Sequence, residues 1–266
     1  MKQTTFSNLL LSALSASLGS LFLSFWFFDS ELALFVHCCY RIVLLIYLLN
    51  AMNPFLIILC VMAGYLIGTL PTARFTTRLV ARKDILEEGS GNAGAMNSYR
   101  VSGKWWAGGL VAAVDILKGY LAVQAGLAVM AAFQVSTFVA PAVAGFFCVF
   151  GHCYNVWQGG RGGRGLAPAA GVMLGINPVP LVVFCLMWAT GYFVIRRNVH
   201  VGSVAGALGT PLLLFSAPEL LLSTFMRVPC EKLSLHTVFL WMLCIQLLVR
   251  HAEPIRELLG GPNDHS

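Results

Sequence analysis

Long apolar runs, separated by short polar segments, dominate the chain from residue 54 onward. The runs lie at about 54–73, 105–131, 136–157, 164–177, 178–195, 203–222 and 233–250. An α-helix needs roughly 20 apolar residues to cross about 30 Å of hydrocarbon. The pattern therefore predicts an all-α fold, a polytopic transmembrane helix bundle with a seven-span core. The run at 164–177 is short, which indicates a tilted or half-inserted helix.

Two further apolar runs, 6–28 and 32–50, precede this core. Lys2 followed by a Ser-rich apolar run is similar to a signal peptide, but no small-x-small cleavage site follows it. Arg41 in mid-run argues against two complete spans. We expect one or two extra N-terminal membrane helices. The chain then divides into a hydrophobic extension (1–53), a seven-span membrane domain (54–258) and a cytoplasmic tail (259–266).

The composition favours a membrane protein and excludes an ordinary soluble one. Hydrophobic residues make up 58% of the chain and charged residues 11%, with a mean hydropathy of +0.78, whereas a soluble domain carries about 25% charged residues. The eight cysteines form no CxxC pair, so we interpret them as small hydrophobes rather than disulfide or metal ligands. We expect no cofactor, no metal and no nucleic acid, and nothing in the sequence identifies a protein partner.

The distribution of Lys and Arg between the loops predicts the orientation. If the run 54–73 starts outside, twelve basic residues fall in inside loops and two fall outside. The inside set is Arg74, Arg78, Arg82, Lys83, Arg100, Lys104, Arg161, Arg164, Arg196, Arg197, Arg250 and Arg256, and the outside set is Arg227 and Lys232. This bias predicts that the polar clusters described next, and the C-terminus, face the cytoplasm.

A first polar cluster occupies residues 89–100, with the sequence Gly-Ser-Gly-Asn-Ala-Gly-Ala-Met-Asn-Ser-Tyr-Arg. Its glycines allow positive φ angles and close approach of a ligand, and successive N–H groups predict an anion-binding concavity. Neutral hydrogen-bonding groups and positive charges accompany them: Ser90, Asn92, Asn97, Arg100 and Lys104. By composition alone, a Gly-rich turn with ordinary positive-inside residues is an equally good interpretation.

A second cluster joins Gly151 and His152 to the segment 159–165, Gly-Gly-Arg-Gly-Gly-Arg-Gly. Five glycines around two arginines disfavour a helix and predict a flexible loop at a membrane boundary. Arg161 and Arg164 offer planar guanidinium groups, which bind phosphate bidentately. The segment lacks the GK[ST] ending of a Walker A loop, and nonspecific contact with lipid headgroups is the simpler interpretation that stays open.

Charged residues at the end of the last span and inside the second span complete the candidate chemistry. His251 lies in the segment 250–256, where the last helix leaves the bilayer, and is either an interfacial residue or part of a site. Asp115 and Lys118 lie three residues apart on one helical face. Charges at that depth are costly, so both a structural ion pair and a functional role stay open.

Several familiar kinds of site are absent from the sequence. It contains no HxxxxD dyad, no GxSxG elbow and no His, Cys and Asp set at metal-ligand spacing. A transporter of phosphate esters would show inverted repeats, and no repeat is present. Glycine loops, arginines and hydroxyls without an evident general base suit phosphate-bearing substrates that bring their own reactivity.

In order and spacing, these elements resemble the bacterial acyl-phosphate-dependent glycerol-3-phosphate acyltransferases. The matching elements are Tyr65 to Pro71, Lys83-Asp84-Ile85, residues 89–100 (GSGN-x-GATN-x-x-R), Asp115 to Gly119 (D-x-x-K-G), Gly151-His152 with 161–165 (GH and [KR]GGKG), and Arg250-His251 with Ile255 (RH-x-x-N-I). The resemblance covers about residues 54–258 and leaves out the N-terminal extension.

The resemblance implies an enzyme that transfers a fatty acyl group from acyl phosphate to the 1-hydroxyl of sn-glycerol 3-phosphate. The products are lysophosphatidic acid and phosphate, in phospholipid biosynthesis. It also implies a multi-pass protein of the bacterial inner membrane, among membrane lipids, with its active-site loops in the cytoplasm. Acyl phosphate is an activated mixed anhydride, so positioning and charge stabilisation suffice, and the departing phosphate takes the hydroxyl proton.

Matching residue by residue gives the candidate site. The catalytic candidates, in contact with phosphate and the oxyanion, are Ser90, Arg100, Lys104, Arg164 and His251. The substrate-binding candidates are Asn92, Asn97, Arg161, Gly162, Gly163 and Ser203, of which the two asparagines either shape the first loop or bind glycerol.

Some positions depart from the family's pattern. Ala93, Met96, Arg164 and His200 stand where Pro, Thr, Lys and Ser are usual. Pro254 replaces an Asn three residues after His251; proline has no side-chain amide and no N–H, and predicts that the last helix ends near this point. One substrate contact is then lost or supplied from elsewhere. The alternative function is a non-catalytic or altered homologue that binds anionic lipid or phosphate headgroups.

Overall fold

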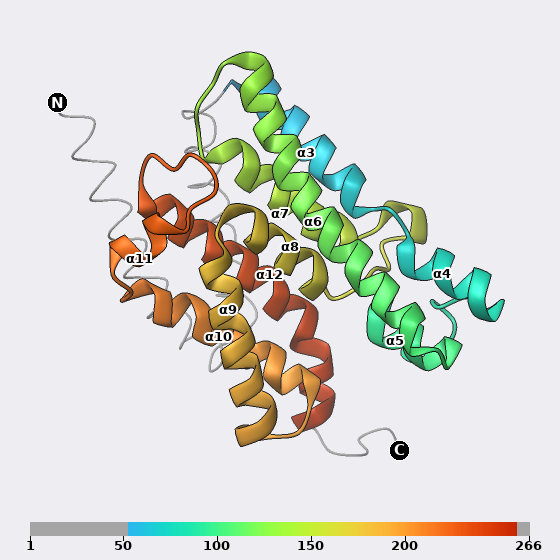
Figure 1. The fold of residues 1–266 in the computed structure, drawn as a ribbon. Coiled ribbons are helices and arrows are strands. Elements are labelled where there is room, and N and C mark those ends of the chain that lie inside the picture. The colour runs from blue at the N-terminus through green and yellow to red at the C-terminus, as the bar shows by residue number, and fades with distance from the viewer. Residues whose placement is uncertain (1–52, 260–266) are drawn as a thin grey trace, which may run out of the picture.

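The computed structural model describes residues 53–259, and Figure 1 shows their arrangement. The membrane helices expected within residues 1–53 and the expected tail lie almost wholly outside the described residues. Each apolar run predicted between 54 and 250 contains a helix, and no strand occurs in the described part of the chain. The prediction of an all-α fold is therefore confirmed.

The helices follow one another through the whole described chain. They are α3 Pro54–Gly68, α4 Thr72–Ala81, α5 Ala95–Ser102, α6 Trp105–Phe133, α7 Val139–Cys153, the 3-10 turn η1 Val156–Gln158, α8 Leu166–Ile176, α9 Pro178–Thr190, the π-helical turn η2 Gly191–Ile195, α10 Val199–Phe215, α11 Glu219–Thr224 and α12 Leu233–Leu259. Helix boundaries follow local chemistry, as at α9, where Asn177 caps the first turn and Pro178 occupies its first position.

Five helical segments of the described chain are long and apolar enough to cross a membrane. These are Pro54–Ala81, Trp105–Phe133, Val139–Gln158, Pro178–Ile195 and Leu233–Leu258. The helices α8 and α10 are shorter, with 11 and 17 residues. The expected shortness of the fourth run is confirmed, whereas seven complete spans remain a prediction.

Direct backbone contact between α3 and α7 builds one wall of the bundle. Gly64 and Gly68 lie four residues apart on α3, a spacing typical of closely packed membrane helices. A Cβ atom at Gly64 would collide with the carbonyl of Ala144, and one at Gly68 with that of Cys148. The absence of side chains at these two positions therefore allows the two backbones to touch.

Besides an apolar core between α3, α6 and α7, two apolar cores hold the remaining helices. The larger lies among α7, α8, α10 and α12 and includes Val149, Val172, Leu243 and Leu247, all fully buried. The smaller consists of Ala73, Ile85, Leu86, Ala93 and Val111. This smaller core attaches α4, α5 and the first polar cluster to α6, so the cluster has a fixed place on the bundle.

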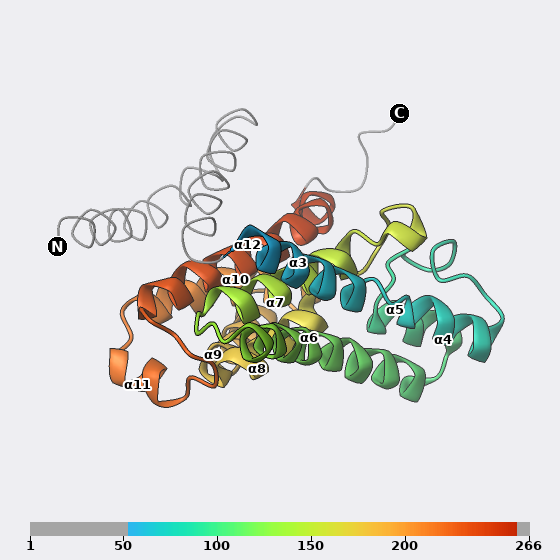
Figure 2. The ribbon, with the colours of Figure 1, turned by 90° about the horizontal axis from the view of Figure 1, so that it is seen from above.

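The helices α4 and α5 lie together at one end of the bundle, and α11 lies at the other (Figures 1 and 2). Helix α5 and most of α4 fall within residues 74–104, whose basic residues the sequence analysis placed in an inside loop. That expectation is corrected for two reasons of local structure. Gly103, with φ of 66°, ends α5 in the left-handed region. Burial of Ala73, Thr76 and Thr77 on one side of α4 holds that helix against its neighbours.

The last helix contradicts a second expectation. Pro254 lies inside α12, which continues to Leu259 instead of ending near the proline. Proline removes the hydrogen bond to the carbonyl four residues earlier, on Arg250. Ile255, directly after the proline, is buried, and packing beyond Pro254 thus outweighs the missing hydrogen bond.

Candidate functional site

The first polar cluster is folded around the side chain of Asn97. Its Nδ2 donates to the carbonyls of Ile85 and Glu88 at 3.2 and 3.0 Å, and its Oδ1 accepts from the N–H of Ser90 at 3.1 Å. Only 2% of Asn97 is exposed. Of the two roles expected for this residue, shaping the loop is the one that its contacts display.

The backbone amides of this loop differ from the expected anion-binding concavity. Gly89 and Gly91 do have positive φ angles, 63° and 65°, as predicted. The N–H groups of Ser90, Gly91 and Gly94 nevertheless donate to acceptors inside the loop. These three amides are therefore not available to a ligand, because each already donates a hydrogen bond within the loop. The side chain of Ser90 stays at the surface, and Asn92 is half-buried.

The second glycine cluster is packed rather than free. Gly162 and Gly163 are buried, and the N–H of Gly163 donates to the carbonyl of His152 at 3.1 Å. A Cβ atom at Gly163 would collide with the ring of His152. The expectation of a flexible loop overlooked this contact, because composition does not reveal what covers a glycine.

Arg250 anchors this loop from α12. Its Nη2 donates to the carbonyls of Gly162 and Gly163 at 3.4 and 3.2 Å, and its guanidinium lies over the ring of Tyr154 at 5.1 Å. Sequence reasoning did not assign Arg250 to the site. Its position directly before His251 was the available signal.

Arg164 lies among several charges. Burial lowers the pKa of its guanidinium, as do the positive charges of Arg250 and Arg100, while Glu257 and Glu253 act in the opposite direction. No hydrogen bond or ion pair joins Arg164 to another group within residues 53–259. Because arginine stays protonated in proteins, this part of the molecule holds a positive charge without a direct partner in the described structure.

Two histidines from different helices meet beside these arginines. The rings of His251 on α12 and His200 on α10 have centroids 5.6 Å apart. His251 Nδ1 lies 2.8 Å from the carbonyl of Leu247, and since a carbonyl only accepts, we place the proton on Nδ1. Nε2 is then a hydrogen-bond acceptor.

Arg164 and Arg100 also influence His200. Burial lowers the pKa of the His200 imidazole, and the positive charges of Arg164 and Arg100 lower it further. The structure thus gathers Arg100, Arg164, His251 and His200, which we call the arginine–histidine cluster. Three of these four were candidates from the sequence, and His200 had been noted only as a departure from the family's pattern.

Other candidates have partners elsewhere. Lys104 is exposed, with its ammonium 5.7 Å from the ring centre of Trp106. Arg161 forms an exposed ion pair with Glu87 at 3.1 Å. Ser203 is buried, and its hydroxyl donates to the carbonyl of Val199 at 2.7 Å, one turn back in the same helix. Within the described residues, no hydrogen bond or ion pair joins any of the three to the arginine–histidine cluster.

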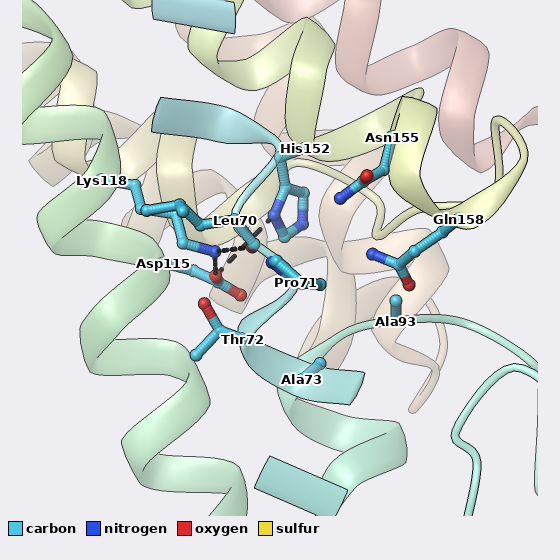
Figure 3. Close-up of a pocket in the computed structure, with 10 residues that line it drawn as sticks. All are labelled: Leu70, Pro71, Thr72, Ala73, Ala93, Asp115, Lys118, His152, Asn155 and Gln158. Carbon is cyan, nitrogen blue, oxygen red and sulfur yellow. Dashed lines mark hydrogen bonds and ion pairs between the residues drawn. The ribbon is translucent and has the colours of Figure 1, made fainter. Parts of the chain in front are cut away.

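A second polar centre lies inside the bundle (Figure 3). Lys118 Nζ is 2.6 Å from Asp115 Oδ1 and donates to the carbonyl of Leu70 at 2.7 Å. His152 Nδ1 lies 3.8 Å from the same carboxylate oxygen. Asp115 and Lys118 are 1% and 3% exposed. Of the two interpretations left open by the sequence, the structure displays the mutually neutralising ion pair, which we call the buried ion pair.

A small polar cavity of about 10 Å³ adjoins this pair (Figure 3). Asn155 and Gln158 line it together with Lys118 and His152. Asn155 Nδ2 donates to the carbonyl of Thr69 at 2.7 Å, while Gln158 Oε1 is buried without a partner in the described residues. The volume is close to the space for one water molecule, and is far too small for a phosphate ester.

A third charged group ties α4 to the segment that leads into the first cluster. Asp84 accepts hydrogen bonds from Arg74, at 2.6 Å to Nη2, and from Arg78, also at 2.6 Å. The hydrogen bonds from Arg74 hold the pKa of the Asp84 carboxyl well below its usual range. Within residues 53–259 no set of three or more His, Cys, Asp or Glu side chains is placed to hold a metal ion.

Known proteins share this sequence and fold. A family model for glycerol-3-phosphate acyltransferase matches residues 58–261. A glycerol-3-phosphate acyltransferase of Chlorobium phaeobacteroides is 32% identical over 217 residues, covering 74% of this chain and 91% of the relative. One from Agrobacterium fabrum is 34% identical over 209 residues, covering 78% and 91%.

Solved structures agree with these relatives. Two crystal structures of PlsY, an integral membrane glycerol 3-phosphate acyltransferase, represent its glycerol 3-phosphate and lysophosphatidic acid forms. Each is 28% identical to this chain, with a TM-score of 0.58, and the match covers 77% of this chain and 92% of the crystallised one.

Proposed function

Since the chain belongs to the glycerol-3-phosphate acyltransferase family, we propose that it takes its acyl group from acyl phosphate and acts through the arginine–histidine cluster. The protein is an integral, multi-pass membrane enzyme of phospholipid synthesis that acylates glycerol 3-phosphate to lysophosphatidic acid. The resemblance stated from the sequence is thereby confirmed. The alternative of a non-catalytic headgroup-binding homologue rests on Pro254 and the N-terminal extension alone.

The excess of positive charge around Arg164 carries the proposal. Acyl phosphate and glycerol 3-phosphate both present phosphate groups, and guanidinium groups bind phosphate through paired hydrogen bonds. Arg164 and Arg100 lie near each other, and Arg164 has no direct partner in the described residues. An anion placed there would be neutralised without displacing an existing ion pair.

Positioning and charge stabilisation suffice for this reaction, because acyl phosphate is a mixed anhydride. The hydroxyl oxygen of glycerol 3-phosphate attacks the acyl carbon, the bond from that carbon to the phosphate oxygen breaks, and the departing phosphate takes the hydroxyl proton. Arginine groups stabilise the oxyanion that forms between these steps. With its proton on Nδ1, His251 presents an acceptor, so we assign it to a hydroxyl of glycerol 3-phosphate rather than to the oxyanion expected from the sequence.

The remaining candidates keep supporting roles in the proposal. Ser90 and Lys104 are exposed, as is Arg100 of the same polar cluster. Asn97 shapes the loop that carries Ser90. The substrate-binding set is completed by Asn92, Arg161, Gly162, Gly163 and Ser203. The contacts of Arg161 and Ser203 with protein groups make these two the weakest members.

Donor choice tests the proposal. Purified protein is incubated with palmitoyl phosphate and glycerol 3-phosphate, and phosphate release and lysophosphatidic acid are measured. We expect turnover with acyl phosphate and none with acyl-CoA. Equal rates with the two donors would contradict the proposed donor. Unchanged formation of phosphate and lysophosphatidic acid by an Arg164→Ala variant would contradict the proposed site.

We also propose that the end of the bundle with α4 and α5 faces the cytoplasm of a bacterial inner membrane. The count of Lys and Arg supports this orientation, and the helices α4 and α5 lie at one end of the bundle (Figure 2). Impermeant thiol reagents applied outside intact cells should not label a cysteine substituted for Arg161. Labelling there, with protection of one substituted for Arg227, would reverse the orientation.

A further inference from the structure

His200 has a ring nitrogen that no group in the described residues satisfies. Its Nδ1 is buried and has no hydrogen-bond partner there, although the large majority of buried polar side-chain atoms in proteins are paired. Leaving such a group unpaired lowers stability unless a ligand or a rearrangement on binding completes it. The unpaired Nδ1 of His200 therefore lowers the stability of the fold, and a purely structural role does not explain why a histidine is present here.

The backbone around His200 is held by another residue. Asn198 caps α10, and its Oδ1 accepts from the N–H of His200 at 2.7 Å and from that of Val201 at 3.4 Å. Capping satisfies the first amides of the helix. The imidazole is therefore not used for capping, and its position relative to α10 is set by a rigid first turn.

The ring of His200 packs against α12 at His251, three residues before a position that has no hydrogen-bonding side chain. His200 packs beside His251, with ring centroids 5.6 Å apart. Pro254 follows His251 by three residues and so lies on the same helical face. Because proline offers no side-chain donor or acceptor, the imidazole of His200 offers a hydrogen-bonding group next to a turn of α12 in which residue 254 offers none.

Electrostatics also relates the same ring to the arginines of the cluster. The positive charges of Arg164 and Arg100 act on His200, as does that of Arg250 on Arg164. The two positive charges that would attract an anion therefore also act on this ring. Neutral imidazole carries one N–H donor.

We propose that His200 is a substrate-binding residue, whose imidazole donates a hydrogen bond to a phosphate oxygen of the substrate held by Arg164 and Arg100. The proposal rests on the proposed placement of the phosphate-bearing substrates at the arginine–histidine cluster. It concerns binding, so the variant should lose affinity while keeping the rate at saturation. Both substrates carry phosphate, and separate measurement of the two KM values identifies which one His200 contacts.

Two nearly isosteric variants test this inference. His200→Leu removes the donor, and His200→Asn keeps one in a side chain of similar size. Loss of one hydrogen bond corresponds to about a tenfold change, so we expect His200→Leu to raise one KM about tenfold with little change in kcat. His200→Asn should recover most of that loss. Calorimetric titration with glycerol 3-phosphate provides a readout independent of turnover.

His236 provides a matched control. Its Nδ1 is also buried and unpaired within the described residues, but its ring packs against Phe138, with centroids 6.1 Å apart. His236→Leu should leave both KM values unchanged. Thermal unfolding in detergent checks that each variant folds, and His200→Ala replaces His200→Leu if the latter does not.

The outcomes separate this inference from the proposed function. A raised KM for glycerol 3-phosphate, or for acyl phosphate, in the Leu but not the Asn variant supports the proposal and names the substrate. Equal constants in wild type and both variants overturn it, while the function stands. Equal loss in the Leu and Asn variants also overturns it, because packing then explains the effect. Absence of glycerol 3-phosphate binding in the wild type overturns the placement of the substrate and this inference together.

Discussion

The buried ion pair and the arginine–histidine cluster treat charge in opposite ways. In the buried ion pair, Lys118 lies 2.6 Å from Asp115 and its ammonium also donates to the carbonyl of Leu70. In the cluster, Arg164 is under the influence of Arg250 and Arg100 and, in the opposite direction, of Glu257 and Glu253, but no hydrogen bond or ion pair joins it to a partner within residues 53–259. The buried ion pair is neutral and its charges are already partnered, whereas the arginine–histidine cluster keeps a net positive charge.

This difference separates a structural role from a binding role. A paired charge in an apolar interior is tolerated because Coulomb attraction and hydrogen bonds offset its desolvation. A group of like charges is unfavourable by itself and becomes favourable when an anion neutralises it. The buried ion pair therefore holds α6 to the start of α4, whereas the cluster is suited to phosphate.

Removing one member of the buried ion pair should have the largest effect, a loss of folding stability. Lys118→Met leaves the Asp115 carboxylate buried without its partner, which costs about 3–5 kcal/mol of folding stability. Thermal unfolding in detergent measures the loss. In the double variant Asp115→Leu/Lys118→Met both charges are gone, and stability should largely return. An unfolding temperature for Lys118→Met equal to that of wild type, together with lost activity, would indicate that the pair takes part in catalysis and not in holding the fold.

Removing charge from the cluster should act on catalysis rather than on folding. Arg164→Ala is expected to lower kcat/KM about 100-fold, in the range seen for lost oxyanion contacts. Arg164→Lys should be mild because the charge remains, although the bidentate geometry is lost. Kinetics with both substrates and an unfolding curve are measured for each variant. Near-normal kcat/KM in a folded Arg164→Ala would place the site elsewhere.

Restoring a side-chain amide three residues after His251 should have a smaller effect than removing Arg164, and the effect should be a gain in affinity for glycerol 3-phosphate. Pro254→Asn offers a new hydrogen bond to the polar substrate, and we expect KM for glycerol 3-phosphate to fall about tenfold. KM for acyl phosphate should stay nearly constant.

Pro254→Ala is the control for this gain. Alanine restores the backbone N–H of α12 without adding an amide, so it should raise thermal stability and leave both KM values unchanged. The same fall in KM for the Ala and Asn variants would show that helix geometry, and not the side-chain amide, limits binding.

The exposed ion pair of Arg161 with Glu87 should have the smallest effect. Exposed pairs contribute about 0–1 kcal/mol, and this one lies at the surface of the loop. Arg161→Ala should therefore change stability by less than that amount and kcat/KM far less than Arg164→Ala does. A loss as large as that of Arg164→Ala would show that the arginine leaves Glu87 to bind substrate.

Local patterns determined much of the candidate site before any tertiary contact was known. The spacing of Asp115 and Lys118 placed both charges on one helical face, because three residues make nearly one turn. The glycines at 89 and 91 indicated positive φ angles, which the structure has. In each case the relevant neighbours are close in sequence, so residue type and spacing were sufficient.

The sequence by itself also determined the all-α membrane fold, because each apolar run must satisfy its own backbone hydrogen bonds within the bilayer. Only the tertiary structure decided that Asn97 bonds to Ile85, that Arg250 holds the second glycine loop and that His200 meets His251. These partners lie on different elements, and packing of the helices sets their distances. For the same reason α12 continues through Pro254, where burial of the following residue outweighs one missing hydrogen bond.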